Sequence, residues 1–160
     1  MKDLFEEYLS KNDLPNIKRA LTASSRKQMD HTLNNKDVAD DLATLGDTVI
    51  KLCYAKYFLD KCEKLSQKIE KYITDEVFVT KIAKHYELLK NIAYDKNDKK
   101  IPCDYNYEKP KRTSGKNKKQ SRHKYIATAV EAMIGAIYLE TKDLKRITEL
   151  LLTWTKYIEN

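Results

Sequence analysis

The sequence predicts an all-α fold, and three observations support this prediction. The 160-residue chain contains only three glycines and three prolines, which is too few for the many turns of a sandwich or a barrel. Apolar residues recur at helical spacing, as in Leu42, Leu45, Val49 and Leu52. Alternation of apolar and polar residues, the pattern of a strand, never extends beyond four residues. The length fits one domain over residues 1–160.

The first half of the chain contains three expected helices. Residues 2–10 place their apolar side chains on one face, which predicts a short helix. A second helix is expected from Pro15 to about residue 23, because proline is favoured in the first turn of a helix. The polar stretch 28–36 is expected to be a loop. The long amphipathic pattern over 37–62 predicts the third helix, with Cys53 among its buried residues.

The second half contains four further expected helices. Residues 65–72 have helical periodicity, and Thr74 can cap a helix that runs over 76–93. Residues 126–139 are strongly apolar and are expected to form a buried helix. An amphipathic pattern over 144–158 predicts the last helix.

The basic character of the chain is concentrated in one segment, Asp95–Lys124. This segment holds 11 basic and four acidic residues, so it accounts for the whole net charge of +7. Pro102, Pro110 and Gly115 also lie in it, and we therefore expect a mobile loop over about 95–124. Clustered lysines and arginines favour binding to a nucleic-acid backbone. A solvated linker without a partner is the alternative interpretation.

Gly46 and Gly135 both lie inside helical patterns, where glycine is destabilising by about 1 kcal/mol relative to alanine. A glycine in such a place often lets two backbones approach closely. Each lies near a carboxylate in an apolar setting, Asp47 and Glu131 respectively. Two helices that cross at these glycines would bring the two carboxylates together as a site for Mg²⁺, which binds to one or two carboxylates plus water and phosphate oxygens. Alternatively, the carboxylates pair with lysines or lie on the solvent-exposed edge of the helices.

Several classes of protein are disfavoured by the sequence. No apolar run is long enough to span a membrane, and the N-terminus lacks the apolar core of a signal peptide. Cys53, Cys62 and Cys103 are an odd number without CxxC spacing, which favours free thiols in a reducing cytoplasm. The three histidines lack zinc-binding spacing. We therefore expect a cytoplasmic protein without a membrane partner.

Four segments of the chain resemble the ribonuclease III family in order and spacing. The stretch LATLGDTV, which contains Asp47, resembles the first signature of the family, E-x-x-E-F-L-G-D-[AS]-V. The stretch TAVEAMIGAIYL, which contains Glu131, resembles the second signature, D-x-x-E-A-L-I-G-A-[IV]-[YF]-L. The segments ALTASS, at 20–25, and TKIAKHYEL, at 80–88, also match. The resemblance thus covers nearly the whole chain.

Two positions depart from the usual family pattern. Ala43 stands where the family usually has glutamate, and Thr128 stands where it usually has aspartate. Asp40 replaces the first glutamate of the signature conservatively. Ala43 and Thr128 agree with the compact and active mini-ribonuclease III branch, whereas the segment at 20–25 is closer to the longer ribonucleases III. The subfamily therefore remains open.

The resemblance implies a metal-dependent endoribonuclease that hydrolyses phosphodiester bonds in double-stranded or structured RNA. Asp47 and Glu131 would bind Mg²⁺ or Mn²⁺ directly, and Asp40 would support the catalytic site. The family fold is a helical dimer, so a homodimer is expected. No double-stranded RNA-binding domain is expected in this sequence. An inactive RNA-binding or scaffold subunit, or one half of a heterodimer, are the alternatives.

Without a separate RNA-binding domain, the basic segment is the expected source of RNA contacts. The candidate RNA-binding residues are Lys109, Lys111, Arg112, Lys116, Lys118, Lys119, Arg122 and Lys124.

Overall fold

The computed structural model describes residues 1–93, Tyr107 and residues 118–160. Throughout this part of the chain the regular structure is helical, and no strand occurs in it. The only extended pairing among these residues is an isolated parallel bridge between Thr22 and Ala93. The predicted all-α fold is therefore confirmed.

The N-terminal half forms helices close to the expected positions. Asp3 caps the first helix, because its Oδ1 accepts a hydrogen bond from the Glu6 backbone N–H at 2.9 Å. Pro15 is the first residue of the second helix, as predicted. A single turn of helix, Arg26–Met29, includes the first two residues of the loop that was expected over 28–36. The helices are α1 (Leu4–Leu9), α2 (Pro15–Ala20), α3 (Arg26–Met29), α4 (Asp40–Phe58) and α5 (Leu65–Glu70).

The helix expected over 76–93 is instead divided into short pieces. Glu87 adopts a left-handed backbone with φ of 49°, which interrupts the helix. The break lets the chain turn back, so that the Ala93 N–H donates to the Leu21 carbonyl at 2.8 Å and the Ala23 N–H donates to the Ala93 carbonyl at 2.9 Å. This tertiary pairing outweighs local helix propensity. The pieces are α6 (Asp75–Val77), the π-helical η1 (Phe78–Ala83) and the 3₁₀-helical η2 (Leu88–Lys90).

The last two helices are α7 (Lys118–Thr141) and α8 (Leu144–Glu159). The predicted basic loop over 95–124 is therefore too long, because residues 118–124 belong to α7. No glycine or proline lies between residues 116 and 134. A helix that forms in the apolar stretch 126–139 can therefore continue backwards along the chain to residue 118. The rest of the predicted loop lies outside the described residues, apart from Tyr107, which packs against the core.

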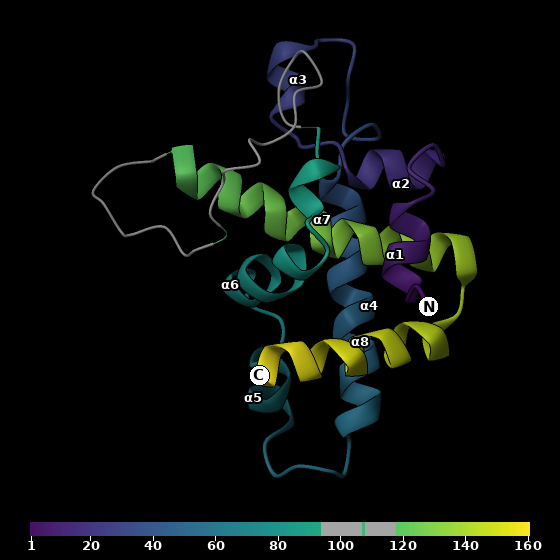
Figure 1. Cartoon of the computed structure of the whole chain (residues 1–160), viewed down its shortest axis with the longest axis vertical. Coiled ribbons are helices and arrows are strands. Elements are labelled where there is room, and N and C mark those ends of the chain that lie inside the picture. Colours follow the sequence, from purple (N-terminus) through teal and green to yellow (C-terminus); the bar gives the residue numbers. More distant parts are fainter. Residues whose placement is uncertain (94–106, 108–117) are drawn as a thin grey trace.

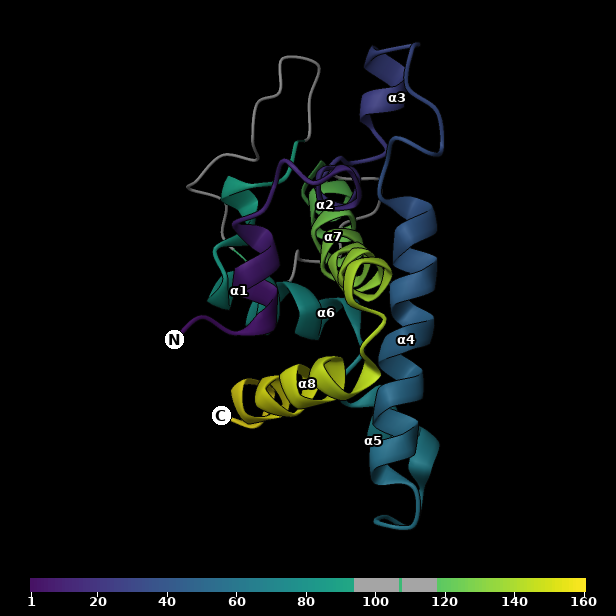
Figure 2. The same cartoon turned by 90° about the vertical axis from the view of Figure 1, so that its right-hand side faces the viewer.

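The long helices α4 and α7 cross at the centre of the molecule, and α8 packs against α4 (Figures 1 and 2). Helix α8 buries Ile147, Leu150, Leu151 and Trp154, which follow the predicted amphipathic pattern. Cys53 on α4 is buried as expected. These contacts hold α4 from one side and leave its N-terminal half available to α7.

Phe5, Tyr86 and Trp154 form an aromatic corner between α1, α8 and the segment after η1. The Phe5 ring lies 4.4 Å from the Tyr86 ring and 5.5 Å from the Trp154 ring, measured between centroids. The Trp154 indole N–H donates to the Tyr86 hydroxyl at 2.8 Å, and this hydroxyl donates to Asp3 Oδ2 at 2.6 Å. Each buried polar group of the corner therefore has a partner, as a stable core requires.

Candidate active site at the crossing of α4 and α7

Gly46 on α4 and Gly135 on α7 face each other where the two helices cross. A methyl group built on Gly46 would overlap the carbonyl oxygen of Glu131, and one built on Gly135 would overlap the carbonyl oxygen of Leu42. The two backbones are thus too close for any larger residue at either position. The prediction that these glycines permit close approach of two helices is confirmed.

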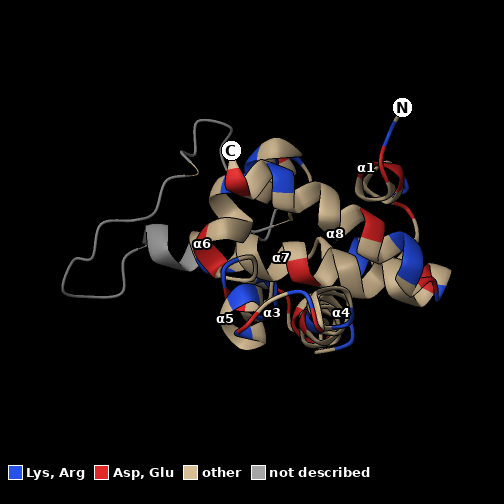
Figure 3. Ribbon diagram, turned by 90° about the horizontal axis from the view of Figure 1, so that it is seen from below, with Lys and Arg blue, Asp and Glu red and all other residues tan. Residues whose placement is uncertain are grey.

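This crossing places the sequence-predicted carboxylates in one surface pocket of about 490 Å³. Asp40 and Asp47 come from α4 and lie two turns apart, which puts them on the same helix face. Glu131 comes from α7, and Ala43 and Thr128 lie in the same lining. We call this the carboxylate pocket; it is lined by Ser24, Asp40, Ala43, Thr44, Asp47, Lys124, Tyr125, Thr128 and Glu131. Figure 3 shows an acidic stretch of ribbon in the middle of α7, beside α4.

The surroundings of Glu131 disfavour its charged form. Burial raises the pKa of Glu131 to about 7, and the negative charges of Asp47 and Asp75 add to the effect. Lys124 and Lys51 oppose it only in part. The Lys51 ammonium binds Asp47 Oδ2 at 2.7 Å, so this lysine is already engaged by the neighbouring carboxylate. Glu131 itself has no ion pair among the described residues.

The donor set fits a hard divalent cation. A cation between the two carboxylates would stabilise the charge of Glu131, and oxygen ligands suit Mg²⁺ or Mn²⁺. Within the described ranges, no three histidine, cysteine, aspartate or glutamate side chains come together closely enough to hold a metal ion. Asp47 and Glu131 would therefore have to share the ion with water and a substrate oxygen. Asp40 lines the same pocket without completing a cluster of three ligands.

The candidate RNA-binding residues separate into three groups in the structure. Lys109, Lys111, Arg112 and Lys116 lie outside the described residues. The backbone of α7 includes Lys118, Lys119 and Arg122, but their side chains are outside what the structure describes. The eighth residue, Lys124, lines the carboxylate pocket and binds Asp75 Oδ2 at 3.0 Å.

Asp75 is a charged neighbour of the pocket that the sequence pattern did not reveal. Thr74 provides the predicted helix cap, since its Oγ1 accepts from the Val77 N–H at 3.2 Å. Asp75, the next residue, appears in sequence only as an ordinary acidic residue of a first turn. Its relation to Lys124 and Glu131 depends on how α6 packs against α7, which no local pattern encodes.

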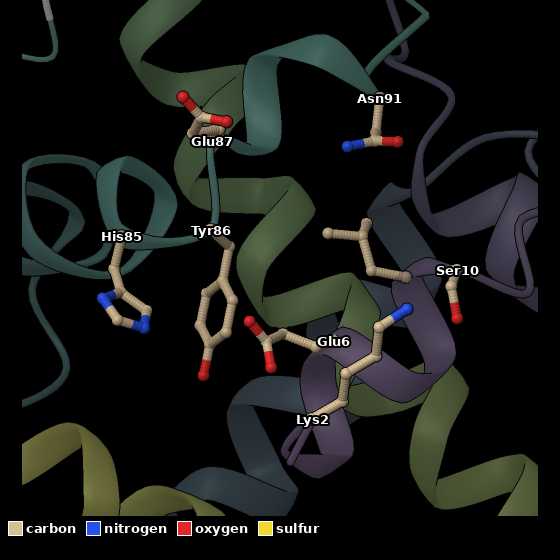
Figure 4. Close-up of a pocket in the computed structure, with 8 residues that line it drawn as sticks. Lys2, Glu6, Ser10, His85, Tyr86, Glu87 and Asn91 are labelled. Carbon is tan, nitrogen blue, oxygen red and sulfur yellow. The ribbon is translucent and has the colours of Figure 1, made fainter.

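A second pocket, of about 410 Å³, lies between α1 and the segment that follows η1 (Figure 4). His85 and Tyr86 line it, but the His85 ring stacks on Tyr157 at 4.1 Å and the Tyr86 hydroxyl belongs to the aromatic corner. Lys2 and Glu6 contribute opposite charges. Because these groups serve packing or oppose each other in charge, the carboxylate pocket remains the candidate active site.

A protein-family model and a solved structure match this chain. The model of the ribonuclease III domain family matches residues 40–142, which include both long crossing helices. The crystal structure of the nuclease domain of ribonuclease III from Campylobacter jejuni has a similar fold, with a TM-score of 0.60 and 22% sequence identity, over 99% of this chain and 95% of that one. The comparison with curated proteins gave no match.

No helix in the described part of the chain is long and apolar enough to cross a membrane. The family match spans both carboxylates of the glycine crossing, Asp47 and Glu131, and more than half of the chain. This chain therefore belongs to the ribonuclease III domain family.

Proposed function

We propose that this protein is a divalent-metal-dependent endoribonuclease that hydrolyses phosphodiester bonds in double-stranded or structured RNA. The observation that carries the proposal is the pair Asp47 and Glu131, which two separate helices bring into one pocket at a glycine crossing. The raised pKa of Glu131 supports it, because perturbed carboxylates concentrate at functional sites.

In this proposal Asp47 and Glu131 hold Mg²⁺ or Mn²⁺, which supplies the charge that activates water and stabilises the leaving 3′ oxygen. Lys51 orients the Asp47 carboxylate through its contact at 2.7 Å. Asp40 adds negative charge at the end of the same helix face. Ala43 and Thr128 leave room in the pocket for water and a phosphate oxygen.

RNA binding is assigned to the basic segment and to the N-terminal part of α7. Lys109, Lys111, Arg112 and Lys116 precede the helix, and Lys118, Lys119, Arg122 and Lys124 lie within it. A-form RNA is recognised mostly through its shape, its phosphates and its 2′-hydroxyl groups, so clustered cations suit this substrate. The protein would act as a homodimer, as the family resemblance implies. Leu52, Tyr57 and Leu59 are exposed apolar residues that suit burial in a subunit interface.

The catalytic proposal is tested with Asp47→Asn and Glu131→Gln. Each should abolish Mg²⁺-dependent cleavage of a long RNA duplex, because each removes a charged oxygen ligand while keeping the side-chain volume. Thr48→Ala is the control, because Thr48 is the next residue of α4, is exposed and does not line the pocket; this variant should cleave normally. Cleavage at the wild-type rate by either carboxylate variant would remove that residue from the active site.

A catalytically inactive RNA-binding or scaffold subunit is the second candidate. The specific observation in its favour is that Ala43 and Thr128 line the pocket at positions where the family usually has acidic residues. This second candidate function predicts that the wild-type protein binds duplex RNA but does not cleave it in the presence of Mg²⁺ or Mn²⁺. The same duplex assay thus separates the two candidates.

A further inference from the structure

A basic pocket lies among α2, α3 and the segment that precedes α4. Its volume is about 520 Å³, within the range of pockets that hold small organic ligands. One acidic residue, Asp37, lines it, together with four basic residues: Lys18, Arg19, Arg26 and Lys36. Figures 1 and 2 show α2 and α3 near the end of the molecule at which α4 begins.

Positive charge is concentrated around this pocket. Residues 18–36 hold five basic residues and one acidic residue, although the chain outside 95–124 has no net charge. The dipole of α2 favours Lys18 and Arg19 in its last turn, but it does not account for Arg26 and Lys36, which come from other segments. Like charges around one pocket repel one another, and a bound anion would offset this repulsion.

The basic residues of the pocket differ in what already holds them. The Arg19 guanidinium donates to the Asn35 carbonyl at 3.2 Å and lies 3.6 Å from the Asp41 carboxylate, so it fixes the segment before α4. Lys18 and Lys36 are exposed, and within the described residues their side chains have no ion pair and no hydrogen bond. These two ammonium groups are therefore available to a ligand.

An adjoining pocket of about 510 Å³ shares Lys18 and Arg26 with the basic pocket. Asn12 and Asn91 contribute amide side chains to its lining, which also includes apolar side chains and one carboxylate, that of Asp13. Amide groups beside apolar surface suit the uncharged body of a small organic ligand, such as a nucleoside. The two pockets together suit a ligand that has an anionic group at one end and a nucleoside at the other.

The basic pocket is separate from the carboxylate pocket. The Ala39 N–H donates to the Thr22 carbonyl at 3.0 Å, which joins the segment after α2 to the segment before α4. Thr22 lines the basic pocket, whereas Ser24 and Asp40, from the same two parts of the chain, line the carboxylate pocket. The two pockets share no lining residue, so binding to one can be measured independently of the other.

We propose that the basic pocket binds the phosphomonoester group of a nucleotide through Lys18, Arg26 and Lys36. A phosphomonoester carries nearly two negative charges at neutral pH, whereas a phosphodiester within an RNA strand carries one, so the monoester is the better match for three cations. The group belongs to a free mononucleotide or to the phosphorylated end of an RNA strand. This inference goes beyond the proposed function, because it uses no residue of the carboxylate pocket.

The test uses the whole 160-residue chain in EDTA, with adenosine 5′-monophosphate as the probe and adenosine as the matched ligand without a phosphate. Isothermal titration calorimetry measures both ligands against the wild type, Lys18→Gln, Lys36→Gln and the double variant. Lys18→Arg/Lys36→Arg keeps both charges. Lys84→Gln/Lys145→Gln is the matched control, because it removes the same charge from two exposed lysines that line neither pocket.

Adenosine 5′-monophosphate should bind to the wild type, and adenosine should not. Lys18→Gln and Lys36→Gln should each weaken binding by roughly threefold to tenfold, and the double variant by roughly tenfold to a hundredfold, because each substitution removes one charge-assisted contact. Lys18→Arg/Lys36→Arg and the control variant should bind as the wild type does. Melting temperatures should not change, since all four lysines are exposed.

Two RNA duplexes that differ only in a 5′-phosphate or a 5′-hydroxyl end distinguish the two sources of the group. A preference for the phosphorylated duplex that is lost in Lys18→Gln/Lys36→Gln assigns the group to an RNA end. Binding of the mononucleotide without such a preference assigns it to a free nucleotide.

The proposal is overturned if neither mononucleotide binding nor a preference for the phosphorylated duplex is found. Equal affinity for adenosine, or unchanged affinity for the mononucleotide in Lys18→Gln/Lys36→Gln, would also overturn it. None of these measurements requires a metal ion or cleavage. Failure of the endoribonuclease proposal and failure of this inference are thereby distinguished.

Discussion

The carboxylate pocket and the aromatic corner differ in how well their polar groups are stabilised by neighbouring groups. In the aromatic corner the Tyr86 hydroxyl connects Trp154 and Asp3, so every polar atom there is matched with a partner. In the carboxylate pocket Glu131 faces the negative charges of Asp47 and Asp75. The first arrangement stabilises the fold. The second destabilises it, and such a cost is typical of a site that is completed by a ligand.

The two regions also differ in how closely their backbones pack. The aromatic corner fills space with large rings, whereas the crossing of α4 and α7 depends on the absence of side chains at Gly46 and Gly135. Large side chains can adjust their rotamers to a change nearby, but two helix backbones in contact have no such freedom. The site should therefore be the part of the core that is least tolerant of added volume.

The largest expected effect is on the glycine crossing. Gly46→Ala or Gly135→Ala should each destabilise the protein by more than about 3 kcal/mol, because the new methyl group overlaps a backbone carbonyl of the other helix. Chemical denaturation measures the loss, with Thr48→Ala as the control on the exposed face of α4. A destabilisation below about 1 kcal/mol would show that the helices can separate at little cost and would remove this difference between the two regions.

The second-largest effect is expected for the substitution Glu131→Gln, which tests whether the charge of Glu131 destabilises the folded protein. The pKa of Glu131 is raised from 4.5 to about 7, so the folded state holds its proton more strongly than the unfolded state. The stability that protonation provides is fully present below about pH 4.5 and is lost as the pH rises through 7. In EDTA, Glu131→Gln should therefore be more stable than the wild type by roughly 2 kcal/mol at pH 8, after allowance for solvent screening.

Denaturation of the wild type and Glu131→Gln at several pH values checks this prediction. The difference in unfolding free energy should grow between pH 4.5 and pH 7 and stay constant above it. A difference independent of pH would mean that the carboxylate is not strained in the folded protein.

The smallest effect concerns the aromatic corner. Tyr86→Phe removes the hydroxyl that accepts from Trp154 and donates to Asp3, and it should destabilise the protein by about 1–2 kcal/mol. RNA cleavage should be unchanged, since the corner is separate from the carboxylate pocket. Thermal denaturation and the duplex assay measure the two properties. Loss of cleavage in a folded variant would show that the two regions are coupled.

Much of this arrangement could be predicted from local patterns. The positions of α1, α4, α5 and α8 follow from apolar spacing, because a helix that buries one face needs that spacing. The placement of Asp47 and Glu131 in one pocket could be predicted because each lies near a glycine in an apolar helix. A glycine and a carboxylate both destabilise such a helix when it is isolated. Local patterns did not predict the structure where a long-range contact determines it. The break at Glu87 serves the pairing of Ala93 with Leu21 and Ala23, some seventy residues away in sequence.

The sequence by itself determined the helical class, the family resemblance and the identity of the two central carboxylates, since these depend on residue types at short spacing. Only the tertiary structure decided how close α4 and α7 lie, which charges surround Glu131 and that Lys124 meets Asp75 at the edge of the pocket. Electrostatic energies depend on distances between groups and on their burial. Both quantities arise from the packing of distant segments, which no local pattern of residues contains.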